Sequence, residues 1–369
     1  MVSSNKQINF FYSKTTSKNV RIIIGIDSIF NLDKFLKNFY ADMIFIICDD
    51  NVANLYAKKI QKIIKRLPVY LVTHSPNEKS KNLKTAKKIM DIIIKEGGSE
   101  NSIICSLGGG VTGNIAGFVS SVLFRGLTLI HIPTTLLAQL DSAPDVKQSL
   151  NTILIKNGIG SYKAPDLVLI DPQFMISLSE RDIRSGYAEA IKHAFAQDLD
   201  FIKFIASLFK NNDYINLNYL EKVIIKTISL KIYHWKNVPT MWNDMGKVER
   251  LTHLGHTIGK VLEIIDLGYL THGEAIAHGM VIEFYISFKL GYLDIAKVKK
   301  AQEIMNDMGL LFPLSKKYTQ NKIMKLLYSS SSDKEPLVAL LQDFGNPDTI
   351  SLHLPRAITK EALKWYFSL

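Results

Sequence analysis

The sequence predicts an α/β fold: an N-terminal, Rossmann-like domain with a parallel sheet, followed by a mainly α-helical domain, with a cleft between them. Three observations support this prediction. Short β-branched runs alternate with helical stretches up to about residue 172, which is typical of βαβ units. One of these runs leads directly into a glycine cluster and then a helix. From Glu180 onward nearly every segment has the helical period.

A length of 369 residues exceeds the size at which a single hydrophobic core usually stops growing, so two domains are expected, residues 1–172 and 173–369. Six apolar runs predict the strands: residues 20–26, 43–48, 69–73, 102–107, 127–132 and 167–170. Helical spacing predicts helices between the first strands at residues 28–40 and 52–65. In the second domain it predicts helices at residues 181–195, 219–238, 251–265, 274–290 and 294–308.

Composition narrows the range of partners. The net charge is +11, but the lysines occur singly or in short pairs without interleaved aromatic residues, which argues against a nucleic acid partner. The charge instead favours the attraction of anionic substrates. Cys48 and Cys105 each lie in an apolar run and are expected to be buried thiols. The first residues lack a signal-peptide layout and no apolar stretch approaches the ~20 residues that cross a bilayer, so a cytoplasmic location without membrane contact is expected.

The glycine cluster predicts an anion-binding turn. Gly108, Gly110 and Gly113 satisfy G-x-G-x-x-G between a strand-like run and a helix, and glycines allow backbone N–H groups to approach a phosphate closely. The acid usually found about 20 residues later is missing, since Pro133 lies there. A purely structural glycine-rich turn therefore stays open as an alternative.

Polar residues follow several predicted strands, at the edge where ligands of open α/β sheets bind. Asp49 and Asn51 follow the second strand, although a helix N-cap explains them equally well. Further along, Arg125, Asp141, Lys147, Lys156 and Asn157 come in close succession after the glycine turn, which indicates a site for a second, anionic ligand.

A set of motifs in fixed order resembles a known family. GGGVTGNIAG, FRG, IPTTLLAQLDS, K-x-x-x-N, KN, SGYAEAIK, GHTIG and THGEA resemble the dehydroquinate-synthase-like sugar phosphate cyclases over roughly residues 49–333. That family includes 3-dehydroquinate synthase and 2-deoxy-scyllo-inosose synthase. Spacing alone would not single out a metal site, because His/Glu triplets occur by chance and a lone helical histidine is more often structural.

The resemblance implies NAD and zinc, or cobalt in its place, as cofactors, a small sugar phosphate as substrate, and a homodimer. It implies the zinc ligands Glu189, His256 and His272, whereas His278 is expected to face away. It implies that the dinucleotide is contacted by Asp49, Asn51, Glu78, Lys81, Gly110, Val111, Thr112, Gly113, Asn114, Thr134, Thr135, Lys147, Lys156 and Ser177. It implies that the substrate and its phosphate are handled by Asp141, Lys147, Lys192, Lys260, Arg125, Lys156 and Asn157.

The family chemistry gives these residue types a purpose. NAD is used catalytically to oxidise a ring alcohol, phosphate is then eliminated, and the hydride is returned before an aldol closure forms the carbocycle. Zinc stabilises the alkoxide and the enolate, cations hold the leaving phosphate, and Asp141 handles a hydroxyl proton or orients a cation. Taken singly, each lysine also fits a solvated surface charge, and Lys192 fits an exposed partner of Glu189.

Details of the motifs favour the inosose-synthase type, acting on glucose 6-phosphate. Lys147-Gln148, with Thr112 and Asn114, resembles that branch. Glu249 stands where dehydroquinate synthases carry an arginine, which is unfavourable for their carboxylate-bearing substrate.

Other departures leave alternatives open. Lys260 replaces the second histidine of H-x-x-x-H, His253 replaces Asn or Glu, and Asp333-Lys334-Glu335 only partly keeps D-K-K. The alternatives are 3-dehydroquinate synthase, a polyol dehydrogenase that releases NADH, and a homologue that binds NAD or sugar phosphate without turnover.

Overall fold

The computed structural model describes residues 19–153, 155–237, 251–329 and 335–368. Its N-terminal half contains a six-stranded parallel sheet in the order β1-β8-β5-β4-β2-β3. The strands are β1 (Arg21–Ile24), β2 (Ile44–Asp49), β3 (Val69–His74), β4 (Ile103–Gly108), β5 (Thr128–Pro133) and β8 (Leu167–Ile170). The predicted α/β class and all six predicted strands of this sheet are therefore confirmed.

Helices cover both faces of the sheet because alternate residues of each strand point to opposite sides. Phe45 and Ile47 of β2 pack in one apolar cluster with helices α4 (Leu83–Lys95) and α5 (Gly110–Val122). Ile44 and Ile46 belong to a larger cluster that continues through α1 (Leu32–Leu36) and α3 (Lys58–Ile63) into the helices of the C-terminal half. The two halves therefore share one continuous core on that face.

Short helical segments connect these elements. They are η1 (Ser28–Asn31), α2 (Asp50–Val52), η2 (Ala53–Ala57), η3 (Glu78–Ser80), η4 (Leu123–Arg125), η5 (Ala138–Ser142) and η6 (Pro172–Ser177). The predicted helices at residues 28–40 and 52–65 are thus each divided into shorter pieces. Segment η6 lies between the last strand of the sheet and the first long helix, close to the predicted domain boundary, and that boundary stays a prediction.

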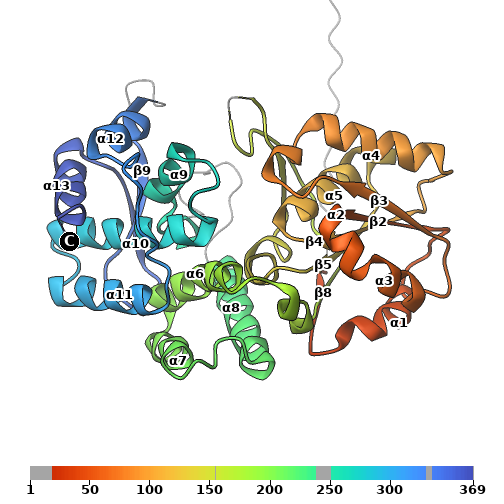
Figure 1. Cartoon of the computed structure of the whole chain (residues 1–369), viewed down its shortest axis with the longest axis horizontal. Coiled ribbons are helices and arrows are strands. Elements are labelled where there is room, and N and C mark those ends of the chain that lie inside the picture. The colour runs from red at the N-terminus through yellow and green to blue at the C-terminus, as the bar shows by residue number, and fades with distance from the viewer. Residues whose placement is uncertain (1–18, 154, 238–250, 330–334, 369) are drawn as a thin grey trace, which may run out of the picture.

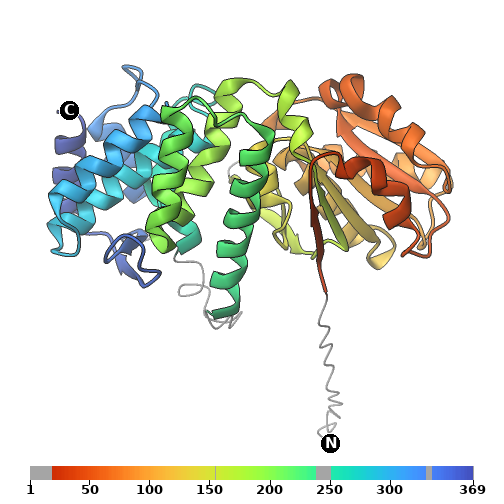
Figure 2. The ribbon, with the colours of Figure 1, turned by 90° about the horizontal axis from the view of Figure 1, so that it is seen from below.

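The C-terminal half is mainly helical, as predicted (Figure 1). Its helices are α6 (Glu180–Gln197), α7 (Leu199–Lys210), α8 (Leu217–Asn237), η7 (Leu251–His253), α9 (His256–Ile265), α10 (His272–Lys289), α11 (Ile295–Asp307), α12 (Gln320–Ser329) and α13 (Arg356–Tyr366). Figure 2 shows α8 standing between the other helices and the sheet, and its contacts with α6, β1, η5 and η6 agree. Helix α10 is central, since its residues from Gly273 to Ser287 are all buried.

Two β-hairpins lie outside the predicted elements. One joins β6 (Lys147–Leu150) and β7 (Ile159–Tyr162) in the N-terminal half, and the other joins β9 (Leu337–Leu341) and β10 (Thr349–His353). Both have strands of only four or five residues, which give weak periodic signals. Cys48 and Cys105 are free and buried, as expected. Within the described part of the chain, no helix is both long and apolar enough to cross a membrane.

Candidate active site

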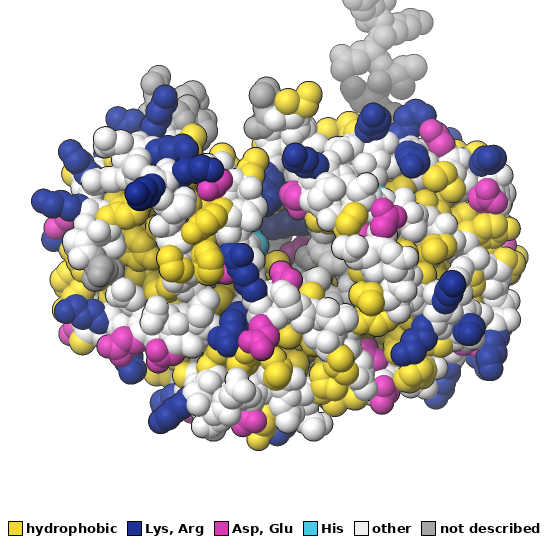
Figure 3. Space-filling view, in the orientation of Figure 1, with side chains coloured by type: hydrophobic (Ala, Val, Ile, Leu, Met, Phe, Trp, Pro, Cys, Tyr) yellow, Lys and Arg dark blue, Asp and Glu magenta, His cyan; other side chains and the backbone are white. Residues whose placement is uncertain are grey.

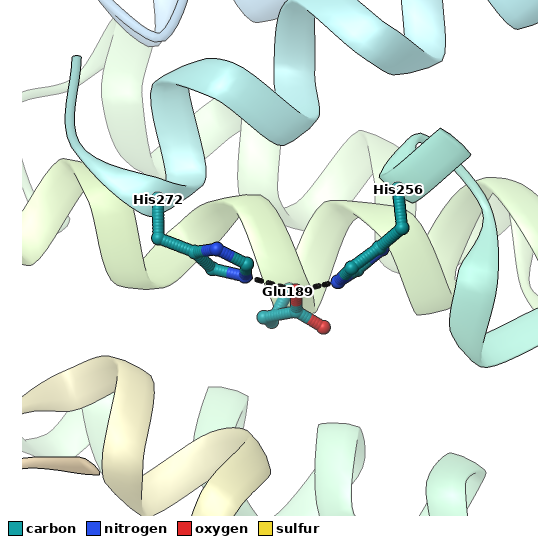
Figure 4. Close-up of side chains that lie close together, drawn as sticks. All are labelled: Glu189, His256 and His272. Atoms are coloured by element: carbon teal, nitrogen blue, oxygen red, sulfur yellow. Dashed lines mark ion pairs between the residues drawn. The ribbon is translucent and has the colours of Figure 1, made fainter. Parts of the chain in front are cut away.

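Glu189, His256 and His272 converge on one point between helices α6, α9 and α10. The Glu189 Oε1 atom lies 3.8 Å from His256 Nε2 and 3.6 Å from His272 Nε2, and one ligand atom from each residue lies within 4.8 Å of the others. Figure 4 shows the two imidazoles reaching Glu189 from opposite sides. Among the described residues, the buried Oε1 accepts no hydrogen bond. A buried carboxylate oxygen left in this way, facing two imidazole nitrogens, fits a divalent cation such as zinc.

Helix α9 is placed by a close contact with α10. Its N-cap is Gly255 (φ +77°), which offers no capping side chain, so the buried carboxylate of Glu283 on α10 accepts from the N–H groups of Gly255 and Ile258 instead. A Cβ on Gly279 would lie 2.0 Å from the Gly255 carbonyl oxygen, so only glycine permits this approach. Burial raises the pKa of Glu283 to about 8. The Glu283 cap and the close approach of α9 to α10 together fix the position of His256, the first residue of α9.

His272 is placed by the start of its own helix and by a carboxylate. Thr271 and Glu274 form a capping box that begins α10 at His272. The His272 Nδ1 atom lies 3.1 Å from Glu263 Oε1. Burial alone would lower the pKa of His272, but its contacts with Glu189 and Glu263 raise it to about 9. The imidazole thus lies between two carboxylates, and its Nε2 atom faces the cluster.

Two buried lysines neutralise the carboxylates near the cluster. Lys192, on α6, donates to Glu189 and to the carbonyl oxygen of Thr252 at 3.1 Å. Lys192 and Glu189, three residues apart, could have formed an exposed pair on the helix surface, but both side chains are buried. Lys231, on α8, lies 2.6 Å from Asp141 Oδ1 and 3.5 Å from Asp145 Oδ2. These contacts hold the pKa of Asp141 below its usual range in spite of burial, and raise that of Lys231.

Lys231 was missed by the sequence reasoning. It lies on the buried side of α8, in line with Ile224 and Ile228 at helical spacing, and its side chain is 1% exposed. A lysine within the apolar stripe of an amphipathic helix was the signal that could have found it, because lysine is almost never fully buried without a partner.

The glycine turn begins α5 at the carboxyl edge of the sheet. Helix α5 starts at Gly110, two residues after β4 ends, and its N-cap Gly109 has no capping side chain. The first N–H groups of α5 therefore lack a side-chain cap, and a helix N-terminus of this kind suits a phosphate. Thr134 and Thr135 follow β5 at the same edge, and a Cβ on Gly109 would lie 3.1 Å from Thr135 Cγ2.

Side chains of the first turns of α5 are held by neighbouring segments. Thr112 is buried, and its hydroxyl lies 3.0 Å from His74 Nε2 at the end of β3. Asn114 donates to the Gly110 carbonyl and accepts from the backbone N–H of Ser149 at 2.7 Å, which ties α5 to β6. Val111 and Gly113 lie in the same turns and are partly exposed.

The connection between β6 and β7 reaches two different parts of the site. Lys81 Nζ donates to Asn157 Oδ1 at 2.6 Å, and Asn151 donates to Glu78 Oε1 at 2.9 Å. Lys156, the residue before Asn157, lies 3.2 Å from Glu263 on α9. Burial lowers the pKa of Lys81 to about 8, although Glu78 acts in the opposite direction.

The residues after β2 have a clear structural role. Asp49 caps α2 by accepting from the N–H groups of Asn51 and Val52, each at 3.0 Å. The N-cap interpretation is therefore confirmed for Asp49, and the contact of Asp49 and Asn51 with a dinucleotide stays a prediction. Ser177, at the end of η6, accepts from the Tyr56 hydroxyl at 2.5 Å.

Other predicted residues are exposed or have partners elsewhere. Arg125 is exposed at the far end of α5, next to the amino end of β5, about 20 Å along the helix from the glycine turn. Lys147 begins β6 and Lys260 lies one turn after His256, and both are exposed. His278 is occupied elsewhere, by the Tyr366 hydroxyl and the Phe312 carbonyl. The predicted departures at Glu249, Asp333 and Lys334 lie outside the described residues.

The space-filling view shows the molecule hollowed between its two halves, with basic, acidic and histidine side chains visible inside (Figure 3). The cluster of Glu189, His256 and His272, a metal-type cluster, comes from the helical half, and the glycine turn comes from the sheet half. The described chain thus has a nucleotide-type turn and a metal-type cluster, linked by the connection between β6 and β7.

Comparison with known proteins agrees with this arrangement. Residues 71–185 match the family described as 3-dehydroquinate synthase N-terminal, and residues 186–335 match 3-dehydroquinate synthase C-terminal. The chain therefore belongs to the dehydroquinate-synthase-like family of enzymes, the sugar phosphate cyclases, which are carbon–oxygen lyases acting on phosphates.

Its relatives divide between two activities. The chain is 34% identical to 3-dehydroquinate synthase of Alkaliphilus metalliredigens, over 80% of this chain and 81% of that one. It is 31% identical to 2-deoxy-scyllo-inosose synthase of Streptoalloteichus tenebrarius, over 86% of this chain and 85% of that one. A crystal structure of 2-deoxy-scyllo-inosose synthase complexed with carbaglucose-6-phosphate, NAD+ and Co2+ superimposes with a TM-score of 0.82 at 25% identity, covering 94% of this chain and 96% of that one.

Proposed function

We propose that the protein is an NAD- and zinc-dependent sugar phosphate cyclase of the 2-deoxy-scyllo-inosose synthase type, with cobalt able to replace zinc and glucose 6-phosphate as substrate. One observation carries the proposal. Adjacent residues of the β6–β7 connection contact both sides of the site. Asn157 accepts from Lys81 and from Ser149, which in turn donates to Asn114 of the nucleotide-type turn, and Lys156 pairs with Glu263 beside the metal-type cluster. A dinucleotide and a metal-bound substrate would thus meet in the same cleft.

The proposed role of each residue follows from its position in the site. Glu189, His256 and His272 would hold the metal, which supplies Lewis-acid stabilisation of substrate oxygens. Asp141, paired with Lys231, stays anionic and can accept a hydroxyl proton or orient a cation. Lys192 and Lys156 offer charge-assisted donors to an anionic substrate group, and Asn157 offers a neutral donor. The predicted contacts of Lys147 and Lys260 are part of the same proposal, whereas Arg125, at the far end of α5, is left out of it.

The choice of substrate rests on charge. The sequence has Glu249 where dehydroquinate synthases have arginine. When a bound carboxylate loses its charged partner, the loss typically costs a few kcal/mol of binding free energy, on the order of a hundredfold in affinity. Glucose 6-phosphate has no carboxylate and is affected less. The 34% identity to a 3-dehydroquinate synthase makes that activity the second candidate.

The test is an assay of the purified protein with NAD, zinc and either glucose 6-phosphate or 3-deoxy-arabino-heptulosonate 7-phosphate. Release of phosphate without net NADH from glucose 6-phosphate is the expected result. Faster release from the heptulosonate would assign 3-dehydroquinate synthase activity instead. Accumulation of NADH would indicate a dehydrogenase, and neither product would indicate a binding protein without turnover. Homodimeric assembly and a cytoplasmic location stay predictions.

A further inference from the structure

The carboxylate of Glu263 makes two contacts through one oxygen atom. Its Oε1 atom lies 3.1 Å from His272 Nδ1 and 3.2 Å from Lys156 Nζ. The Glu263 side chain is only 12% exposed, whereas the Lys156 side chain is 42% exposed, so the contact with His272 is the better shielded of the two. One oxygen atom of Glu263 is therefore shared between a predicted metal ligand and a predicted substrate cation.

The first contact determines which nitrogen of His272 faces the cluster. A metal binds the neutral form of the ring, and in that form an Nδ1–H donated to Glu263 leaves the lone pair on Nε2, on the side of Glu189. His256 is fixed in a related way, but by a backbone group, since its Nδ1 atom lies 3.1 Å from the Leu254 carbonyl oxygen. Of these two histidines, only His272 depends on a side chain that also contacts the N-terminal half.

The second contact joins the two halves of the chain. Lys156 belongs to the β6–β7 connection of the N-terminal half, whereas Glu263 lies two turns after His256 on α9 of the C-terminal half. Asn157, next to Lys156, accepts from Lys81 at 2.6 Å. A movement of the β6–β7 connection therefore changes both the environment of Lys81 and the charge that balances Glu263.

We propose that Glu263 is a positioning residue that orients His272 for the metal and, through Lys156, couples the metal site to the β6–β7 connection. The proposal deepens the proposed function and rests on its metal site. Removing a carboxylate that orients a metal-binding histidine typically weakens metal affinity about 10- to 100-fold.

The experiment measures Zn²⁺ and Co²⁺ affinity by calorimetry in the full chain, without substrate. Glu263→Ala should weaken affinity about 10- to 100-fold. Glu263→Gln keeps a carbonyl acceptor for His272 Nδ1–H and should lose less than the Ala variant. Asp266→Ala is the matched control, since it removes another carboxylate at the end of α9, paired with the exposed Lys317 at 2.9 Å. This control should bind metal like the wild type.

Hydrogen exchange tests the coupling. Both Glu263→Ala and Lys156→Met should accelerate exchange of the β6 and β7 amides, and Lys156→Met should weaken metal binding less than Glu263→Ala does, because it leaves the acceptor of His272 in place. If Glu263→Ala does not fold, the metal affinities of Glu263→Gln and Lys156→Met are compared instead. Only Glu263→Gln alters the acceptor of His272, so it should lose more affinity.

Three outcomes would overturn the inference. They are wild-type metal affinity in Glu263→Ala, equal losses in the Gln and Ala variants, and unchanged exchange of β6 and β7 in Glu263→Ala. A wild-type chain that binds no divalent ion would instead refute the metal site of the proposed function, so the two failures are distinguishable.

Discussion

Lys231, which is buried, contacts Asp141, whose side chain is 32% exposed, and the pair joins the two halves of the chain. The Lys231 Nζ atom lies 2.6 Å from both the carbonyl and the carboxylate oxygen of Asp141. Lys231 comes from α8 and Asp141 from η5, which follows the strand next to the glycine turn. The contact therefore holds the only carboxylate of η5 at the cleft and joins α8 to the sheet side.

We expect Lys231→Met to lower the free energy of unfolding by about 3 kcal/mol, because removing one partner of a buried ion pair leaves the other charge without compensation. Urea unfolding measures this loss. The double variant Lys231→Met/Asp141→Asn should lose less than the sum of the single variants, since it removes both charges. Additive losses would show that the two side chains do not interact energetically.

His272→Ala should abolish stoichiometric zinc binding, because it removes one of three converging ligands. Metal analysis after dialysis measures the change. His278→Gln is the control on the same helix, as His278 contacts Tyr366 and Phe312 rather than the cluster. Unchanged metal content in His272→Ala would refute the assigned ligand set.

Gly110→Val should weaken NAD binding at least about tenfold, or ~1.4 kcal/mol, because its side chain would enter the space above the first turn of α5. A Cβ at Gly110 itself meets only Ser142 Oγ at 3.3 Å, so the variant should fold. Gly25→Ala is the comparison, since Gly25 lies outside the predicted NAD contacts and its Cβ would meet Ser28 Cβ at an ordinary 3.9 Å. Calorimetry giving equal NAD affinities for both variants would contradict this placement.

NAD affinity should fall as the pH is raised through about 8, because burial lowers the pKa of Lys81 to about 8 and the neutral amine attracts the pyrophosphate less. Binding should take up protons near this pH, which titrations in buffers of different ionisation enthalpy detect. Lys81→Arg keeps its charge and should bind with little pH dependence between pH 7 and 9. Without NAD, the same lowered pKa makes stability rise between about pH 8 and the ordinary pKa of lysine, since the unfolded chain then binds more protons.

Much of the fold followed from the sequence because its signals are local. Apolar runs identified β2 and β4 within a few residues. Long stretches of helical periodicity did the same for α6 and α10. The β6–β7 hairpin escaped detection, although it carries Lys147 and leads to Asn157, because pairing of four-residue strands depends on tertiary contacts.

The cluster of Glu189, His256 and His272 was predicted through family resemblance, since no spacing rule connects residues on three helices. Glu263 and Lys231 were missed for a related reason. Their roles come from partners 107 and 90 residues away in the chain, Lys156 and Asp141. A sequence pattern can indicate a buried charge, but only the fold shows what neutralises it.

The lysines around the cleft already have partners: Lys192 contacts Glu189, Lys156 contacts Glu263 and Lys231 contacts Asp141. An arriving anion must therefore exchange one partner for another, and it gains only the difference between two ion pairs. Inorganic phosphate has nothing to offer the displaced carboxylates and should bind weakly, which would favour its departure as a product. A ligand that brings hydroxyl groups or a cation to those carboxylates would satisfy both sides of each exchange. The cleft would then select the ligand that gives each lysine and each carboxylate a new partner. The +11 charge of the whole chain would matter far less.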